Sequence, residues 1–200
     1  MRNVLSVMVL AVAVVAASSF PRNARSVAAA PQQSSAVFDS VGNLKLPTGF
    51  RSWVQVGTPL TPNGLNNGEA GFPEFHSVYI EKKNVDVYLK TGSFPEGTVI
   101  VKELTRVLTP TFPDGSRMEP SGRGYFNGEY NGIDETVKDS KRFADTNGWG
   151  FFTFGHHPLP YEKTSAEEPV ADCAGCHIGV AKTDMTWVQF YPLLRDKKGY

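Results

Sequence analysis

Apolar positions along the chain gather into short runs, and most of these runs are separated by Gly, Pro, Asn and Asp. Short runs rich in β-branched and aromatic residues between such turn formers are typical of strands. The segment 98–107 is the densest in β-branched residues and gives the strongest strand signal. The strands predicted from this pattern are 53–57, 75–80, 98–107, 124–130 and 149–154.

Helical signals are fewer. Residues 85–90 are followed by Gly92, a residue that is common just beyond the end of a helix. Segments rich in Pro, Gly and Asn at 59–73 and 110–122 predict loops. The other helices expected are 46–51, the polar stretch between residues 130 and 149, 171–180 and 185–194. With no internal repeat, the pattern predicts one α+β domain over residues 31–200.

The N-terminus predicts export. Arg2 precedes an apolar run over residues 4–17, and small residues follow at 16–19. This run is too short for a comfortable membrane span, so residues 1–30 are expected to be a signal peptide, with cleavage near Ser19 or within 28–30. A retained N-terminal anchor is the alternative. In either case the folded protein is expected outside the cytoplasm, in the periplasm.

Charge excludes one class of partner. The chain has 20 basic and 20 acidic residues, and the first thirty positions hold three of the basic residues and no acid. Residues 31–200 therefore carry a net charge of −3. A slightly acidic domain is a poor candidate for binding nucleic acid.

The two cysteines of the chain lie in the pentapeptide Cys173-Ala174-Gly175-Cys176-His177. A disulfide across two intervening residues is a strained small ring, usually found in redox-active sites that rarely have histidine next. The spacing fits a c-type haem better, because two thiols can bond the two vinyl groups of one porphyrin while the histidine binds iron. One covalently attached haem is therefore predicted, with His177 as the proximal ligand.

The position of this motif excludes the usual small electron carriers. Cys176 lies 24 positions before the C-terminus, whereas helical electron-transfer cytochromes attach haem near the N-terminus and use a distant Met as second ligand. Met118 and Met185 are the methionines that remain after residue 30, and Met185 is expected to pack in the core. An open sixth position on the iron is predicted, which favours small-molecule binding or chemistry.

Lys102 has two interpretations. On its strand it shares a face with Ile100 and Leu104, while Val101 and Glu103 point the other way. A lysine on a strand commonly protects an edge or extends its ammonium group to water. The alternative is a buried lysine whose pKa is lowered, so that a neutral amine can attack a neighbouring group.

Several short motifs resemble the cytochrome P-460 family, in the family's order and over residues 46–195. They are Trp53-Val-Gln-Val-Gly-Thr58, Ser77-Val-Tyr79, Gly97-Thr-Val-Ile-Val-Lys-Glu-Leu104, Gly124-Tyr-Phe126, Val137-Lys-Asp-Ser140, Arg142-Phe-Ala144, the haem pentapeptide and Phe190-Tyr-Pro192. The resemblance implies a mainly antiparallel β-sheet protein with short helices, usually a homodimer. It also implies a five-coordinate haem with a lysine nitrogen bonded to a meso carbon of the porphyrin, and Lys102 matches that lysine.

The activity that the resemblance implies is oxidation of hydroxylamine to nitric oxide or nitrous oxide, with electrons passed to a soluble carrier. The family's proton-relay glutamate falls opposite Asp134, which is one methylene shorter, with Glu135 next to it as a possible substitute. The family's distal arginine falls opposite His76, which can accept a proton where arginine cannot. Asp134 and His76 are therefore the candidate catalytic residues. His156 and His157 are expected in a polar loop without a role.

Two other functions remain open. The related β-sheet cytochromes c-prime have a similar fold and haem motif, but they lack the lysine and have an apolar distal pocket. A nitric oxide binder or carrier of that kind is the main alternative, and Lys102 is the residue that favours the enzyme. A plain electron carrier is third, because no good sixth ligand is visible in the sequence.

Overall fold

The computed structural model describes residues 35–62, 69–70 and 72–198, so the expected signal peptide lies outside the described residues. The strands are β1 (Val37–Phe38), β2 (Leu44–Lys45), β3 (Val54–Gly57), β4 (Glu74–Ile80), β5 (Val99–Val107), β6 (Arg117–Glu119), β7 (Gly122–Gly124), β8 (Asn127–Lys138), β9 (Trp149–Thr153) and β10 (Thr164–Ser165). The α-helices are α1 (Lys82–Thr91), α2 (Ala174–Val180) and α3 (Pro192–Arg195), and single 3-10 turns span Phe50–Ser52, Ala144–Thr146, Val188–Phe190 and Asp196–Lys198.

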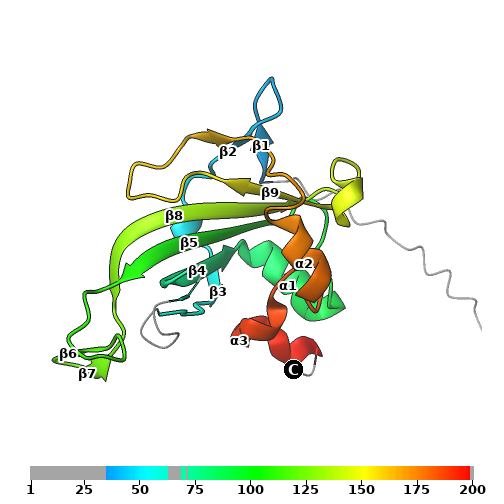
Figure 1. Ribbon diagram of the computed structural model, residues 1–200. Coiled ribbons are helices and arrows are strands. Elements are labelled where there is room, and N and C mark those ends of the chain that lie inside the picture. The colour runs from blue at the N-terminus through cyan, green and yellow to red at the C-terminus, as the bar shows by residue number, and fades with distance from the viewer. Residues whose placement is uncertain (1–34, 63–68, 71, 199–200) are drawn as a thin grey trace, which may run out of the picture. The chain divides into compact units, whose positions relative to one another are not determined.

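A five-stranded antiparallel sheet in the order β3-β4-β5-β8-β9 is the centre of the fold (Figure 1). β5 and β8 are its long inner strands, and their pairing sets Lys102 directly opposite Asp134. β1, β2 and β10 form a small second sheet, and β6 pairs with β7 as a hairpin. The mainly antiparallel α+β fold predicted from the sequence is confirmed.

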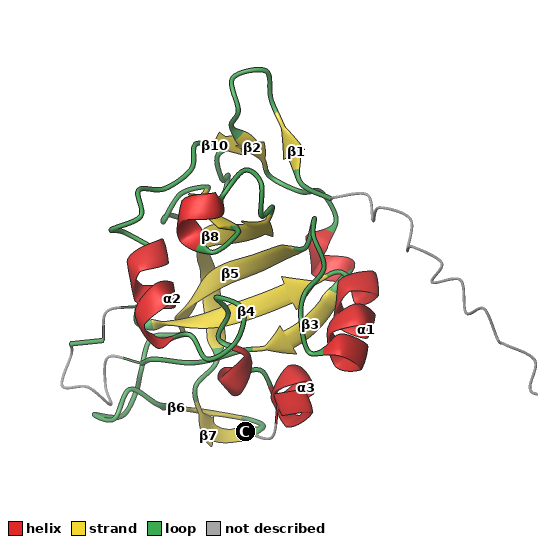
Figure 2. Ribbon diagram, turned by 90° about the vertical axis from the view of Figure 1, so that its right-hand side faces the viewer, coloured by secondary structure: helices red, strands yellow, loops and turns green. Residues whose placement is uncertain are grey.

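Alternation along the strands gives the sheet two buried faces. Ile100 of β5 and Phe151 of β9 belong to one core, which the three helices cover in Figure 2. Val99 and Val101 of β5 belong to the other core, which Phe38, Leu44 and Phe50 cover. Because both faces of β5 are buried, its β-branched residues pack on both sides. The strand predicted there is confirmed, and so is the predicted end of α1 at Gly92, whose N–H donates to the Tyr88 carbonyl over 2.7 Å.

The first part of the polar stretch after residue 130 is a strand, contrary to the sequence prediction, and its later part holds only the 3-10 turn at Ala144–Thr146. Residues 127–138 form one continuous strand, β8, which pairs with β5 on one side and β9 on the other. Ile133 and Val137 are buried at alternate positions, and this period of two outweighs the polar residues between them. The correction places Asp134 in the middle of the sheet.

Two further predictions were wrong in detail. The expected loop 110–122 contains β6 and the start of β7, in the register Arg117↔Gly124. The expected helix 185–194 is broken into a 3-10 turn and the short helix α3. Its first residue, Met185, has a left-handed φ of 56°, and Tyr191 is extended before Pro192. A residue before proline disfavours the helical region, which explains that break. No helix within the described residues is long and apolar enough to cross a membrane.

Glu135 is an ionisable residue inside the second core. Its strand neighbours Val101 and Phe152 are both core residues, and the side chain is 1% exposed. Neither carboxyl oxygen has a hydrogen-bond partner among the described residues. Burial therefore raises the pKa of Glu135 well above its ordinary value, so the folded state favours the neutral acid.

Substitution of Glu135 by Gln should change the pH dependence of stability. An unfolded glutamate ionises above about pH 4.3, whereas the folded carboxyl retains its proton to a higher pH. The folded state then binds more protons, so the free energy of unfolding falls as pH rises from about 4 toward the folded pKa. Urea unfolding at pH 5 to 8 should show that Glu135→Gln loses this fall, which has a limiting slope of about 1.4 kcal/mol per pH unit. Glu129→Gln, at an exposed position of β8, is the control. Parallel pH curves for wild type and Glu135→Gln would contradict the assignment.

Candidate functional site

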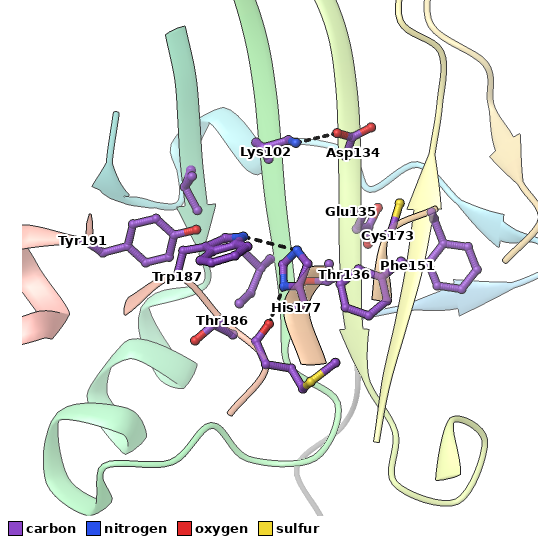
Figure 3. A pocket seen from close by; sticks show the side chains of 14 residues that line it. Lys102, Asp134, Glu135, Thr136, Phe151, Cys173, His177, Thr186, Trp187 and Tyr191 are labelled. Atoms are coloured by element: carbon purple, nitrogen blue, oxygen red, sulfur yellow. Dashed lines mark hydrogen bonds and ion pairs between the residues drawn. The ribbon is translucent and has the colours of Figure 1, made fainter. Parts of the chain in front are cut away.

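His177 lies in the last turn of α2, and its surroundings fix which ring nitrogen carries the proton. Nδ1 is 2.6 Å from the Met185 carbonyl oxygen, which can only accept a hydrogen bond, so Nδ1 carries the proton. Nε2 is 3.2 Å from Trp187 Nε1, whose indole N–H can only donate. Nε2 therefore carries the lone pair of the ring on the side that faces the cavity, where it accepts from Trp187; a metal bound there would replace the indole as its partner (Figure 3).

The imidazole of His177 is also kept neutral. The ring packs between Phe151 and Trp187, with centroids 4.7 and 4.9 Å away. Burial is the main cause that lowers the pKa of His177. The hydrogen bond to Met185 opposes this effect, and the positive charge of Lys102 makes a smaller lowering contribution. A neutral imidazole with a fixed tautomer is the form that binds a metal.

A largely buried ion pair between Lys138 and Asp184 holds the Met185 carbonyl in place. The preceding residue, Asp184, accepts hydrogen bonds from Lys138 Nζ at 2.7 Å, the Phe94 N–H at 3.0 Å and the Trp149 indole at 3.1 Å. Asp184 and Met185 both have left-handed φ values, 48° and 56°, which non-glycine residues rarely adopt. The loop that orients His177 is thus fastened to the end of β8. Met185 itself is 8% exposed in the core, as predicted.

Cys173 and Cys176 form no disulfide with each other. Cys173 lines the cavity and is half-buried, and burial is the main cause that raises the pKa of its thiol. Cys176 is exposed on α2, one residue before His177. No cluster of three His, Cys, Asp or Glu side chains within the described ranges could hold a bare metal ion.

The opposite end of the cavity is charged. Lys102 Nζ is 2.7 Å from Asp134 Oδ2, and each side chain is about one-third exposed, at 33% and 32% (Figure 3). The Phe72 ring lies 5.3 Å from the Lys102 ammonium. Both charged residues line the same cavity as Cys173 and His177, so the sheet and α2 bring these four predicted site residues together.

His76 lies further along the same face of the sheet, two residues before the cavity-lining Val78. Burial lowers the pKa of His76 to about 4, helped by the charge of Lys102 and opposed by Glu74 and Asp134. The charges of Lys102 and Asp134 therefore both affect the pKa of His76, although His76 does not line the cavity.

Other residues of the site were missed in the sequence. Glu74 is buried and accepts a hydrogen bond from Asn131 Nδ2 over 2.7 Å, and His156 Nε2 is also 2.7 Å from it. The prediction that His156 lies in a polar loop is right in location. However, its imidazole is paired with the buried Glu74 carboxylate of β4. The one signal for Glu74 was its position two residues before His76, on the same strand face.

The sequence of this chain was compared with those of known families and proteins. The model of the family described as Cytochrome P460 matches residues 47–188, which cover all of the site residues above. No curated protein matches the chain.

Substitution of Asp184 by Asn should destabilise the protein. Asparagine tolerates the left-handed φ and keeps the size of the side chain, so the change isolates the loss of charge beside Lys138. We expect the free energy of unfolding in urea to fall by about 2 kcal/mol or more, because Lys138 is left as a largely buried, unpaired charge. Asp86→Asn removes an exposed ion pair of the same 2.7 Å length and should cost under about 1 kcal/mol. Equal losses for the two variants would contradict the role of Asp184 as a buried anchor.

Proposed function

The chain belongs to the cytochrome P460 family, and from this premise we propose that it is an exported mono-haem cytochrome c that oxidises hydroxylamine to nitrogen oxides. The family makes it a haem c cytochrome. The substrate, the covalent attachment and the count of one haem per chain are part of the proposal. So are a soluble electron carrier as partner, a homodimer and a periplasmic location, which the basic and apolar N-terminus supports.

The residues of the cavity fit such a haem. Two free thiols are followed by a histidine whose Nε2 lone pair faces the cavity and whose Nδ1–H is held by a backbone carbonyl. We assign Cys173 and Cys176 to the thioether bonds and His177 to the iron. When bound, the haem would supply an iron centre that takes a nitrogen ligand and accepts its electrons.

Lys102 is assigned to the bond with the porphyrin ring. Its ammonium group lines the same cavity as His177, and its strand register directs it to that face of the sheet. The bond would replace a ring C–H, so it also needs a two-electron oxidant from outside the protein. The paired carboxylate of Asp134 can take the proton that the lysine must lose before its nitrogen becomes a nucleophile.

The presence of the Asp134 carboxylate in the cavity is the observation that carries the catalytic proposal. Oxidation of hydroxylamine releases protons and electrons in equal numbers, so a base must lie beside the substrate nitrogen. The carboxylate of Asp134 lies in the cavity on the inner strand β8 and is partly exposed to it. His76, with its neutral imidazole, is the second candidate to receive these protons.

One observation favours the alternative of a nitric oxide binder. The carboxylate of Asp134 is engaged with Lys102 over 2.7 Å, and much of the remaining lining is apolar, including Val78, Ile100 and Phe151. A carboxylate that stays paired with an ammonium group is a weak base. If Lys102 keeps its charge, the cavity is then better suited to bind a neutral gas than to remove protons.

The role of Lys102 is tested by Lys102→Leu. We expect both proteins to keep their haem through acid-acetone extraction, because the thioether bonds do not depend on the lysine. The wild type should show a strongly red-shifted ferrous absorption spectrum, and the variant an ordinary c-type spectrum. Peptide mass mapping of the wild type should find the haem peptide joined to the β5 peptide. Identical spectra would remove the cross-link and favour the gas binder.

The catalytic role of Asp134 is tested by turnover with an electron acceptor. Asp134→Ala should still bind hydroxylamine at ferric iron but should oxidise it roughly a hundredfold more slowly, because the general base is lost. Asp134→Glu should match or exceed the wild type, and exposed Asp145→Ala is the control. A larger loss in His76→Ala would move the role to that residue. A wild type that binds hydroxylamine without oxidising it would overturn the enzymatic proposal.

A further inference from the structure

Glu74 stands between two histidines at the end of the sheet. It is the first residue of β4, it is 2% exposed, and alternation puts it on the same face as His76. Its Oε1 is 2.7 Å from His156 Nε2 and accepts from Asn131. Its Oε2 lies 3.9 Å from His76 Nε2. One carboxylate therefore faces a partly buried imidazole with one oxygen and an exposed imidazole with the other.

Glu74 Oε2 and His76 Nε2 face each other without a hydrogen bond, because no proton lies between them. Both Glu74 Oε2 and His76 Nε2 are buried, and neither has a hydrogen-bond partner among the described residues. His76 also hydrogen-bonds to the Phe72 backbone, and this bond must come from Nδ1 because Nε2 has no partner. Two buried acceptors that face each other are unfavourable. A proton on either atom supplies the missing donor, and a shift of about 1 Å then gives an ordinary hydrogen bond.

The electrostatics make this proton transient. Burial and the charge of Lys102 both lower the pKa of His76, whereas Glu74 and Asp134 raise it. Arg106 Nε donates to Asn131 Oδ1 over 2.8 Å, and Asn131 Nδ2 donates to Glu74, so the carboxyl group is held in place by a hydrogen-bonded chain. His76 can therefore take a proton from the cavity side, but it does not retain the proton at neutral pH.

His156 connects the carboxylate with solvent. Its side chain is 45% exposed, against 3% for Glu74, and its ring stacks on Phe72 with centroids 5.9 Å apart. Gly132 of β8 allows this approach, because a Cβ there would lie 3.1 Å from the His156 ring and 3.0 Å from the Gly155 carbonyl. The ring of His156 thus packs against the end of the sheet, and part of it is exposed to solvent.

We propose that His76, Glu74 and His156 form a proton exit route from the cavity to the surface. The inference rests on the proposed function, which releases protons inside the cavity. A proton taken at His76 Nε2 passes to Glu74 Oε2, and the carboxyl group then turns so that its O–H faces His156. From there the proton passes to the bare Nε2 of the His156 tautomer that is protonated at Nδ1. His156 gives up its Nδ1 proton to water, and exchange with solvent restores its starting tautomer. One proton moves outward, and all three groups return to their first state.

Turnover of the haem-loaded protein tests the route. In weak buffer, Glu74→Gln and His156→Ala should each slow hydroxylamine oxidation by roughly tenfold or more, as expected for loss of a proton-transfer group. Added imidazole should restore His156→Ala, because a free base can replace an exposed ring, but not Glu74→Gln. His157→Ala is the matched control, since His157 pairs with Glu162 over 3.1 Å in the same loop. Wild-type rates in His156→Ala, or a loss that imidazole does not restore, would overturn the route.

A titration tests the route separately from the proposed function, because it does not depend on oxidation of hydroxylamine. Selective ¹⁵N labelling of histidine follows the ring nitrogens of His76 and His156 by NMR. In the wild type both rings should respond to one common titration step, because the Glu74 carboxyl group faces both of them. In Glu74→Gln the two rings should titrate separately, and His157→Ala should leave the common step unchanged. Independent titration of the two rings in the wild type would overturn the route even if the protein oxidises hydroxylamine.

Discussion

The register between β5 and β8 is the constraint on which both the core and the cavity depend. It sets Lys102 opposite Asp134 and Val101 opposite Glu135, so that one pair faces the cavity and the next faces the second core. A slip of one residue would exchange these faces and would bury the ion pair among apolar side chains. Because both faces of the inner strands are covered, packing on either side specifies the same register.

The proximal side of the cavity is built differently. α2 is short, and His177 takes its orientation from a backbone carbonyl in a loop with left-handed residues. That loop is fixed by Lys138, which comes from the last position of β8. The strand that carries Asp134 near its middle therefore also anchors, at its end, the loop that orients the histidine. Both ends of the cavity are positioned by one strand.

How much could be predicted from sequence depended on how local the signal was. The haem motif is local, because the sequence of five residues dictates its chemistry, and the β-branched run around Lys102 is a local strand signal. β8 was missed in part because residues 134–136 are polar although the strand lies between two others. The alternation of buried and partly exposed positions marks the strand there, whereas its polar composition suggests a surface segment. The pair formed by Glu74 and His156 joins residues 82 positions apart, so only the folded sheet reveals it. The same holds for Asp184 and Lys138, which lie 46 positions apart.

The charge of Lys102 acts on both residues that we propose as proton acceptors, Asp134 and His76. While Lys102 is an ammonium group, it holds the Asp134 carboxylate by an ion pair and lowers the pKa of His76. A bond from its nitrogen to a ring carbon would remove that positive charge from the nitrogen at neutral pH. Asp134 would then lose its partner, and one of the causes that lower the pKa of His76 would disappear. Both residues would become better bases through the same covalent change. On the proposed function, the cross-link would thus favour oxidation of the ligand, and its absence would favour binding alone.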